Sequence, residues 1–138
     1  MKYFIASRWR NKKEVIRLYE ALKKKVGEDN VFCFFNNRYN IHHSQGDPEK
    51  EMEEFENLKN WQNNDFVKQI FSEDIQQLKE ADALIMLLPA GNSAHIEAGI
   101  AYGLGKKCIL VGKVEATESH YLIFHEYYDS IEELMGSI

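Results

Sequence analysis

The sequence has no hydrophobic run that approaches the length of a membrane span, few cysteines and no excess of basic residues. A membrane-spanning helix needs about 20 consecutive apolar residues. The formal net charge of −5 argues against general binding to nucleic-acid backbones, because neutralising phosphates requires a basic face. A strand-like segment begins within the first three residues, which leaves no room for a signal peptide. We therefore expect a cytoplasmic protein that contacts neither membranes nor nucleic acids.

Metal ligands and thiol nucleophiles are also scarce. Cys33 and Cys108 are the two cysteines, and each falls in a predicted strand without metal-ligand spacing between them. We expect buried free thiols rather than a disulfide. The five histidines match no zinc pattern, so no metal and no other cofactor is predicted. His42 and His43 lie in a polar segment, where they would be either exposed or part of a lid over a site.

Short apolar segments alternate with amphipathic ones along the 138 residues. Strands are predicted at 3–7, 31–35, 83–88, 108–111 and 127–129. Helices are predicted at 11–26, 49–60, 66–80, 94–104 and 120–125, with a last helical turn at the end. Strands separated by helices indicate right-handed crossovers and a parallel sheet. We predict one domain over 1–138, a compact doubly wound α/β fold of the flavodoxin or Rossmann type. Its sheet would have about five parallel strands, with helices on both faces.

Ligands of such folds bind at the carboxyl ends of the strands, near the switch point between the first and third strands. Two segments follow those strands, 7–11 (SRWRN) and 89–93 (PAGNS). The first offers a hydroxyl, two guanidiniums and helix N–H groups for a phosphate or carboxylate, and an indole that could stack on a base. The glycine spacing of a Walker loop or a dinucleotide motif is missing. The candidate binding residues are Ser7, Arg8, Trp9, Arg10, Gly91, Asn92 and Ser93.

The first segment also has a purely structural interpretation. Ser7 or Asn11 would cap the following helix, the arginines would be solvated, and Trp9 would pack in the core. The residues alone favour neither interpretation over the other.

Glu97 is the sharpest candidate for catalysis. Asn92 or Ser93 could cap its helix, which would put Glu97 in the first full turn, where the helix dipole keeps a carboxylate ionised and its pKa low. The other residues on its face are apolar, namely Ala94, Ala98, Ala101 and Leu104. The carboxylate would therefore stand in the cleft above the strand ends, suited to attack an electrophilic carbon such as a sugar C1. Alternatively, an acid in a first turn simply stabilises the helix.

A second carboxylate could reach the same cleft. Asp74 borders the buried face of the preceding helix, three residues after Phe71 and four before Leu78. Two carboxylates in one cleft can divide the roles of nucleophile and of hydroxyl anchor or proton donor. Asp82, at the opposite end of its strand, is interpreted as a turn residue.

Three segments together resemble the nucleoside 2-deoxyribosyltransferase superfamily, which includes the deoxynucleoside 5′-monophosphate N-glycosidases. They are YFIAS with the following arginines, SEDIQQLKEADALIMLL, and LLPAGNSAHIEAGIAYGLGKKCILV. A more distant similarity is to TIR-type domains. The resemblance implies that Glu97 is the nucleophile that attacks the anomeric carbon, that Asp74 holds the sugar, and that Tyr3 orients the nucleophile. It places Ser7 and an adjacent arginine at a 5′-phosphate seat, and Ser93 in the loop that lines the pocket.

The resemblance further implies a homo-oligomer whose sites are completed across a dimer interface, without a cofactor. Transferases of this superfamily carry another acid six residues before the nucleophile, to protonate the leaving base. Here that position is Gly91. The departure favours a hydrolase, a different acid, or no glycosyl chemistry.

The expected function is cleavage or exchange of an N-glycosidic bond in a nucleoside or nucleoside 5′-monophosphate. The alternatives are an NAD glycohydrolase, as among TIR-like proteins, and a nucleotide-binding sensor without turnover.

Overall fold

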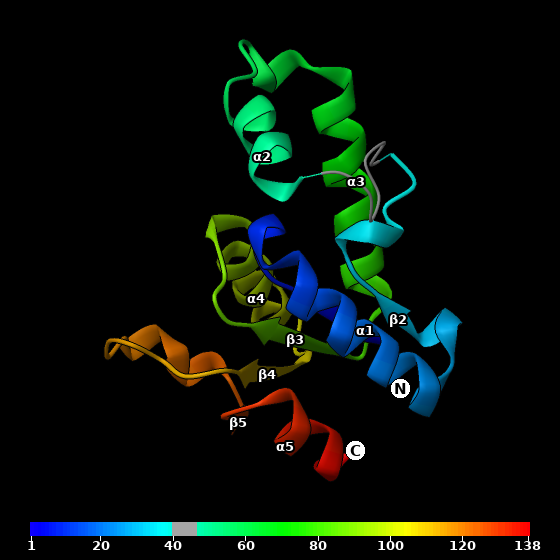
Figure 1. Ribbon diagram of the computed structural model, residues 1–138, viewed down its shortest axis with the longest axis vertical. Helices are drawn as coiled ribbons and strands as arrows, with labels where there is room; N and C mark the ends of the chain where they lie inside the picture. Colours follow the sequence, from blue (N-terminus) through cyan, green and yellow to red (C-terminus); the bar gives the residue numbers. More distant parts are fainter. Residues whose placement is uncertain (40–46) are drawn as a thin grey trace.

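Five parallel strands form one sheet at the centre of the computed structural model, which describes residues 1–39 and 47–138 (Figure 1). The strands are β1 (Tyr3–Ala6), β2 (Val31–Phe32), β3 (Ala83–Leu87), β4 (Lys107–Val111) and β5 (Glu126–Tyr128). Their order across the sheet is β2-β1-β3-β4-β5, with every neighbouring pair parallel. This order is that of flavodoxin-like doubly wound folds. The predicted fold class is confirmed.

Helices cover both faces of the sheet, and side chains of β1 alternate between them. Tyr3 and Ile5 join the core beneath α1 (Lys12–Val26) and α5 (Ile131–Ser137). Phe4 and Ala6 join the core on the opposite face, with Leu78 of α3 (Asp65–Glu80) and the alanines of α4 (Asn92–Gly103). All five residues of β3 are buried, as its continuous apolar run predicts for the central strand of a parallel sheet.

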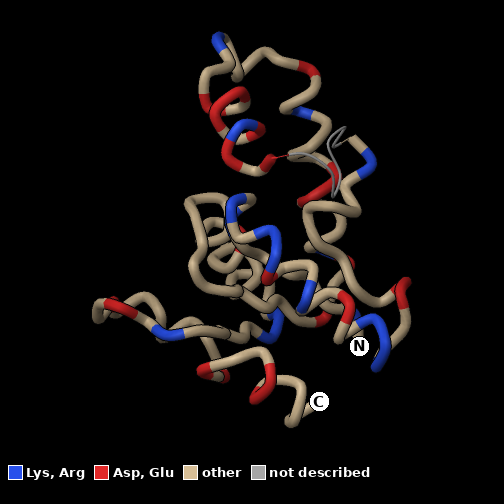
Figure 2. Tube along the Cα trace, in the orientation of Figure 1, with Lys and Arg blue, Asp and Glu red and all other residues tan. Residues whose placement is uncertain are grey.

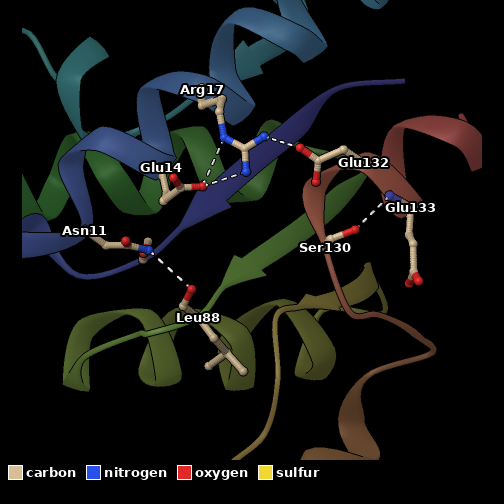
Figure 3. A network of polar contacts seen from close by, with 8 residues as sticks. Asn11, Glu14, Arg17, Leu88, Ser130, Glu132 and Glu133 are labelled. Atoms are coloured by element: carbon tan, nitrogen blue, oxygen red, sulfur yellow. Dashed lines mark hydrogen bonds and ion pairs between the residues drawn. The ribbon is translucent and has the colours of Figure 1, made fainter.

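Helix α1 is amphipathic, and the centre of its apolar stripe is fully buried. Val15, Leu18 and Leu22 have no exposed surface, and the helix ends at Gly27, whose φ of +91° suits glycine. On the outer side, Arg17 contacts both Glu14 and Glu132, so that ion pairs join α1 to α5 (Figure 3). No helix among the described residues is both long and apolar enough to cross a bilayer.

Helix α2 (Pro48–Glu56) and the first half of α3 project away from the sheet (Figure 1). Asp47 caps α2 by accepting the N–H of Glu49, and Pro48 occupies the first helical position, where its missing N–H costs nothing. Acidic side chains dominate this helix (Figure 2). The short 3₁₀ turn η4 (Trp61–Asn63) connects it to α3.

The second strand is shorter than predicted. Only Val31 and Phe32 pair with β1, and the 3₁₀ turn η3 (Phe34–Asn36) replaces the rest of the predicted strand. The reason is local, because the Asn36 side chain accepts the Cys33 N–H at 3.0 Å and folds the chain back. Cys33 therefore lies just after β2, and both cysteines are buried and free, as predicted.

Candidate functional site

The β1–α1 and β3–α4 connections meet at the carboxyl ends of the central strands. Ser7 Oγ donates to the Leu87 carbonyl at 2.8 Å and is itself 6% exposed. Asn11 Nδ2 donates to Ser7 Oγ at 3.1 Å and to the Leu88 carbonyl at 3.4 Å (Figure 3). A Cβ placed on Gly91 would lie only 3.3 Å from the Arg8 Cβ. The Ser7 hydroxyl thus holds the two loops together.

The two arginines of the first loop have different surroundings. Arg10 donates from Nε to Glu49 at 2.8 Å and from Nη2 to Glu56 at 2.7 Å, and so ties the 3₁₀ turn η1 (Trp9–Asn11) to α2. Arg8 is exposed and has no ion-pair partner within residues 1–39 and 47–138. Arg10 is therefore engaged in holding α2, whereas the Arg8 guanidinium is not engaged by another charged side chain of the described residues.

Trp9 packs against other aromatic side chains, as the structural interpretation of its loop predicts. Its ring packs against Phe34 at 4.7 Å and Phe35 at 5.0 Å between centroids. Its Nε1 is buried and has no hydrogen-bond partner among the described residues. The partly buried indole thus packs against the residues that follow β2, and base stacking by Trp9 stays a prediction.

Helix α4 begins earlier than predicted, and no side chain caps it. Its N-cap is Gly91, with extended backbone at φ −93° and ψ −167°. Asn92 and Ser93 are the first two helical residues and are exposed, so the prediction that one of them caps the helix is wrong. Glu97 consequently lies in the second turn, beyond the reach of most of the dipole effect, which acts within the first.

Glu97 is half-buried on the face of α4 that carries Ala94, Ala98 and Ala101. Its carboxyl has a pKa raised to about 8, first by burial and second by the nearby carboxylate of Asp74. The expected low pKa is wrong, because the loss of hydration outweighs a helix dipole that weakens after the first turn.

Asp74 of α3 is brought together with Glu97. The pKa of Asp74 is raised to about 6, mainly by burial, against a hydrogen bond from Asn37 that lowers it and with a smaller rise from Glu73. The Asp74 charge also contributes to the raised pKa of the Cys33 thiol, which is about 12 mainly through burial. Two carboxyl groups with raised and interacting pKa values thus lie between α3 and α4, which is an arrangement typical of functional sites.

Asn37 is a site residue that the sequence interpretation missed. It is 1% exposed, and its Nδ2 donates to Asp74 Oδ1 at 2.9 Å and to the Ile70 carbonyl at 3.0 Å. Asn36 and Asn37 directly follow the predicted strand 31–35. The rule that ligands bind at strand ends would have found Asn37 if it had been applied to the second strand as well as to the first and third.

No family model and no curated protein matches the sequence, but two solved structures are similar over nearly its whole length. One is a 2-deoxyribosyltransferase from the psychrotolerant bacterium Bacillus psychrosaccharolyticus, 17% identical over 98% of this chain and 90% of that chain, with a TM-score of 0.61. The other is the CMP N-glycosidase BcmB of Clostridium botulinum, 18% identical over 99% of this chain and 97% of that chain, with a TM-score of 0.55. The chain has the 2-deoxyribosyltransferase fold. At these identities the similarity establishes the architecture, and the chemistry must be argued from this chain's own residues.

Within this deoxyribosyltransferase fold, Tyr3 lies away from the carboxylate pair. Its side chain packs beneath α1, on the opposite face of the sheet from α4, and is 7% exposed. It lines a cavity of about 320 Å³ at the amino ends of β1 and β2, together with Tyr19 and Phe32. The structure therefore does not bring Tyr3 to Glu97, because strand alternation directs it to the other face.

His95 contacts the loop after β3. In that loop Gly91 stands at the position where the resemblance to transferases predicts an acid. His95 Nδ1 lies 2.7 Å from the Gly91 carbonyl, and its Nε2 lies 2.8 Å from the Tyr121 hydroxyl. Since a carbonyl only accepts, Nδ1 carries the proton, and in the neutral ring Nε2 accepts from Tyr121. His42 and His43 lie outside the described residues. Within the described ranges, no group of three His, Cys, Asp or Glu side chains could hold a metal ion.

Proposed function

We propose that the protein breaks the N-glycosidic bond of a nucleoside or nucleoside 5′-monophosphate, with Glu97 as the nucleophile. The observation that carries the proposal is the pair of half-buried, interacting carboxyl groups of Glu97 and Asp74 above the strand ends. The two similar structures are those of a 2-deoxyribosyltransferase and a CMP N-glycosidase, which supports this class of chemistry.

In the proposed reaction, a Glu97 oxygen forms a bond to C1′ while the C1′–N bond breaks and its electron pair leaves with the base. Water, or a second base, then attacks C1′ and releases Glu97 as a carboxylate. Asp74 beside it would hold the sugar. Ser7 is committed to the loop carbonyls, so that Arg8 is the group proposed to bind a 5′-phosphate.

A panel of nucleosides, nucleoside monophosphates and NAD, incubated with the protein and analysed for free base, tests this function. We expect release from the nucleosides or monophosphates, and a rate that falls as the pH drops through about 6. The sign follows from the pKa values, since below about 6 Asp74 also binds a proton and neither carboxyl of the pair remains ionised. Release from NAD alone would favour the glycohydrolase, and a rate that rises below pH 6 would contradict the role of Glu97.

A nucleotide-binding sensor without turnover is the second candidate, because Gly91 stands where transferases carry the base-protonating acid. Binding of a nucleotide without release of base from any compound of the panel would favour it.

We also propose a homo-oligomer that shares this site. Phe71, one helical turn before Asp74, is 62% exposed, and Ile96, beside Glu97, is 63% exposed. Apolar side chains at such positions favour contact with another protein surface. Sedimentation of the parent and of Phe71→Glu tests this, since the variant should sediment as a smaller species, and a monomeric parent would contradict it.

A further inference from the structure

His95 joins the loop after β3 to the 3₁₀ helix η5 (Ser119–Ile123). Its Nδ1 donates to the Gly91 carbonyl at 2.7 Å, and its Nε2 accepts from the Tyr121 hydroxyl at 2.8 Å. The two rings are stacked, with 5.7 Å between their centroids and 26° between their planes. The imidazole is therefore held at both nitrogens, in the tautomer that carries the proton on Nδ1.

Tyr121 is itself held by neighbours in the last part of the chain. Its carbonyl accepts the Tyr127 hydroxyl at 2.9 Å and the Phe124 N–H at 3.1 Å. Its ring packs against that of Phe124, which is 3% exposed and belongs to the core. The hydroxyl that meets His95 thus comes from a residue that is tied both to β5 and to the core.

The contact fixes a carbonyl that glycine cannot fix by itself. Gly91 is the N-cap of α4, and its carbonyl accepts the His95 backbone N–H at 3.2 Å as well as the ring Nδ1–H. Because glycine has no side chain and an unusually free backbone, the direction of its peptide group depends on what that group binds. Gly91 also lies against Arg8, since an added Cβ would meet the Arg8 Cβ at 3.3 Å. The imidazole thus fixes the residue on which the Arg8 side chain packs.

We propose that His95, supported by Tyr121, is a positioning residue that holds the loop of residues 88–91 against Arg8 and so sets the affinity of the site for the 5′-phosphate of a nucleotide. The proposal rests on the proposed function, including phosphate binding by Arg8. His95 is exposed and lies about 200° around α4 from Glu97, so it acts on binding rather than on bond cleavage. Its loss should raise KM for a nucleoside 5′-monophosphate and leave kcat nearly unchanged.

Three replacements of His95 separate the roles of its two nitrogens. Asparagine keeps a donor at the place of Nδ1, glutamine puts its amide at the place of Nε2, and alanine removes both. Calorimetry in the Glu97→Gln background, which prevents turnover, measures binding of the monophosphate and the nucleoside that the parent binds best. We expect the glutamine and alanine variants to bind the monophosphate about 3- to 10-fold more weakly, the effect of one lost hydrogen bond. His95→Asn should bind it nearly as well as the parent, and the nucleoside affinity should stay unchanged in all three.

His120→Ala is the matched control. His120 is the neighbour of Tyr121 in η5, its side chain is 91% exposed, and it contacts Glu118 rather than Gly91. Its removal should leave the affinity for the monophosphate unchanged. An equal loss in His120→Ala assigns the effect to general loosening of η5 and overturns the role of His95.

Ring ¹⁵N NMR of the full, ligand-free chain tests the contact without any substrate. With the imidazole neutral, we expect His95 to be protonated at Nδ1, with Nε2 as a hydrogen-bonded acceptor. In Tyr121→Phe the ring remains but the hydroxyl is lost, so the Nε2 signal should move while Nδ1 stays protonated. A parent with the proton on Nε2, or an unchanged Nε2 signal in Tyr121→Phe, overturns the arrangement.

The binding measurements can also contradict the proposal. Unchanged monophosphate affinity in His95→Ala overturns the positioning role, and so does equal weakening of nucleoside and monophosphate. A loss in His95→Asn as large as in His95→Ala overturns the assignment to Nδ1. The proposed function fails in a different way: a parent that binds the monophosphate but releases no base contradicts the glycosidic chemistry alone, and the calorimetry still decides the role of His95.

Discussion

Replacing Glu97 by glutamine is expected to reduce base release by at least about a thousandfold, a loss typical of removing a nucleophile from a catalytic unit. The amide keeps the shape of the side chain, and α4 still packs through Ala94, Ala98 and Ala101, which are 0–1% exposed. The fold should therefore persist. The measurements are the rate of free base by chromatography and the circular dichroism spectrum of the variant.

Glu73→Gln is the control for that experiment. Glu73 is the neighbour of Asp74 on α3 and is paired with Arg38, so its loss should lower the rate far less than the loss of Glu97. Base release by Glu97→Gln at the parental rate would remove Glu97 as the nucleophile. A variant that binds nucleotide but releases nothing would separate recognition from turnover.

Replacing Arg8 by glutamine should weaken the binding of a nucleoside 5′-monophosphate about 10- to 100-fold and leave the affinity for the nucleoside unchanged. A guanidinium makes charge-assisted hydrogen bonds to phosphate, and hydrogen bonds to charged groups are the strong ones. Arg8 is exposed beside Gly91 at the strand ends, without an ion-pair partner in the described part of the chain. Titration calorimetry with both ligands measures the effect.

The nucleoside serves as the internal control for Arg8→Gln, because the sugar and base contacts are the same in both ligands. A parent protein that binds nucleoside and monophosphate equally would show that no phosphate seat exists. Equal weakening of both ligands would instead indicate that Arg8 supports the loop rather than the phosphate.

The sheet could be predicted because its signals are continuous along the chain. The run from Ala83 to Leu87 is apolar throughout, and the helices on either side have clear apolar faces. That pattern determines a central parallel strand, and the strand-end rule then brings the loops after β1 and β3 together. The placement of Asp74 follows in part, since Leu78 is buried on the same side of the sheet as the alanines of α4, whereas Phe71, the other residue on which the prediction relied, is 62% exposed.

The properties of the site residues depended on neighbours far along the chain and could not be predicted. Arg10 is engaged by Glu49 and Glu56, 39 and 46 residues away. The pKa of Glu97 is governed by burial, which depends on the packing of two helices rather than on its position in one. Asn37 likewise contacts Asp74, 37 residues further along the chain.

The 3₁₀ turn at Trp9–Asn11 joins the outlying helix α2 to the loop after β3. Arg10 forms ion pairs with the acidic helix α2, and Asn11 donates a hydrogen bond to the loop after β3. Arg8 lies one residue before the turn. The same three-residue turn therefore fixes the position of α2 relative to the loop after β3, directly beside the guanidinium that we propose binds a phosphate.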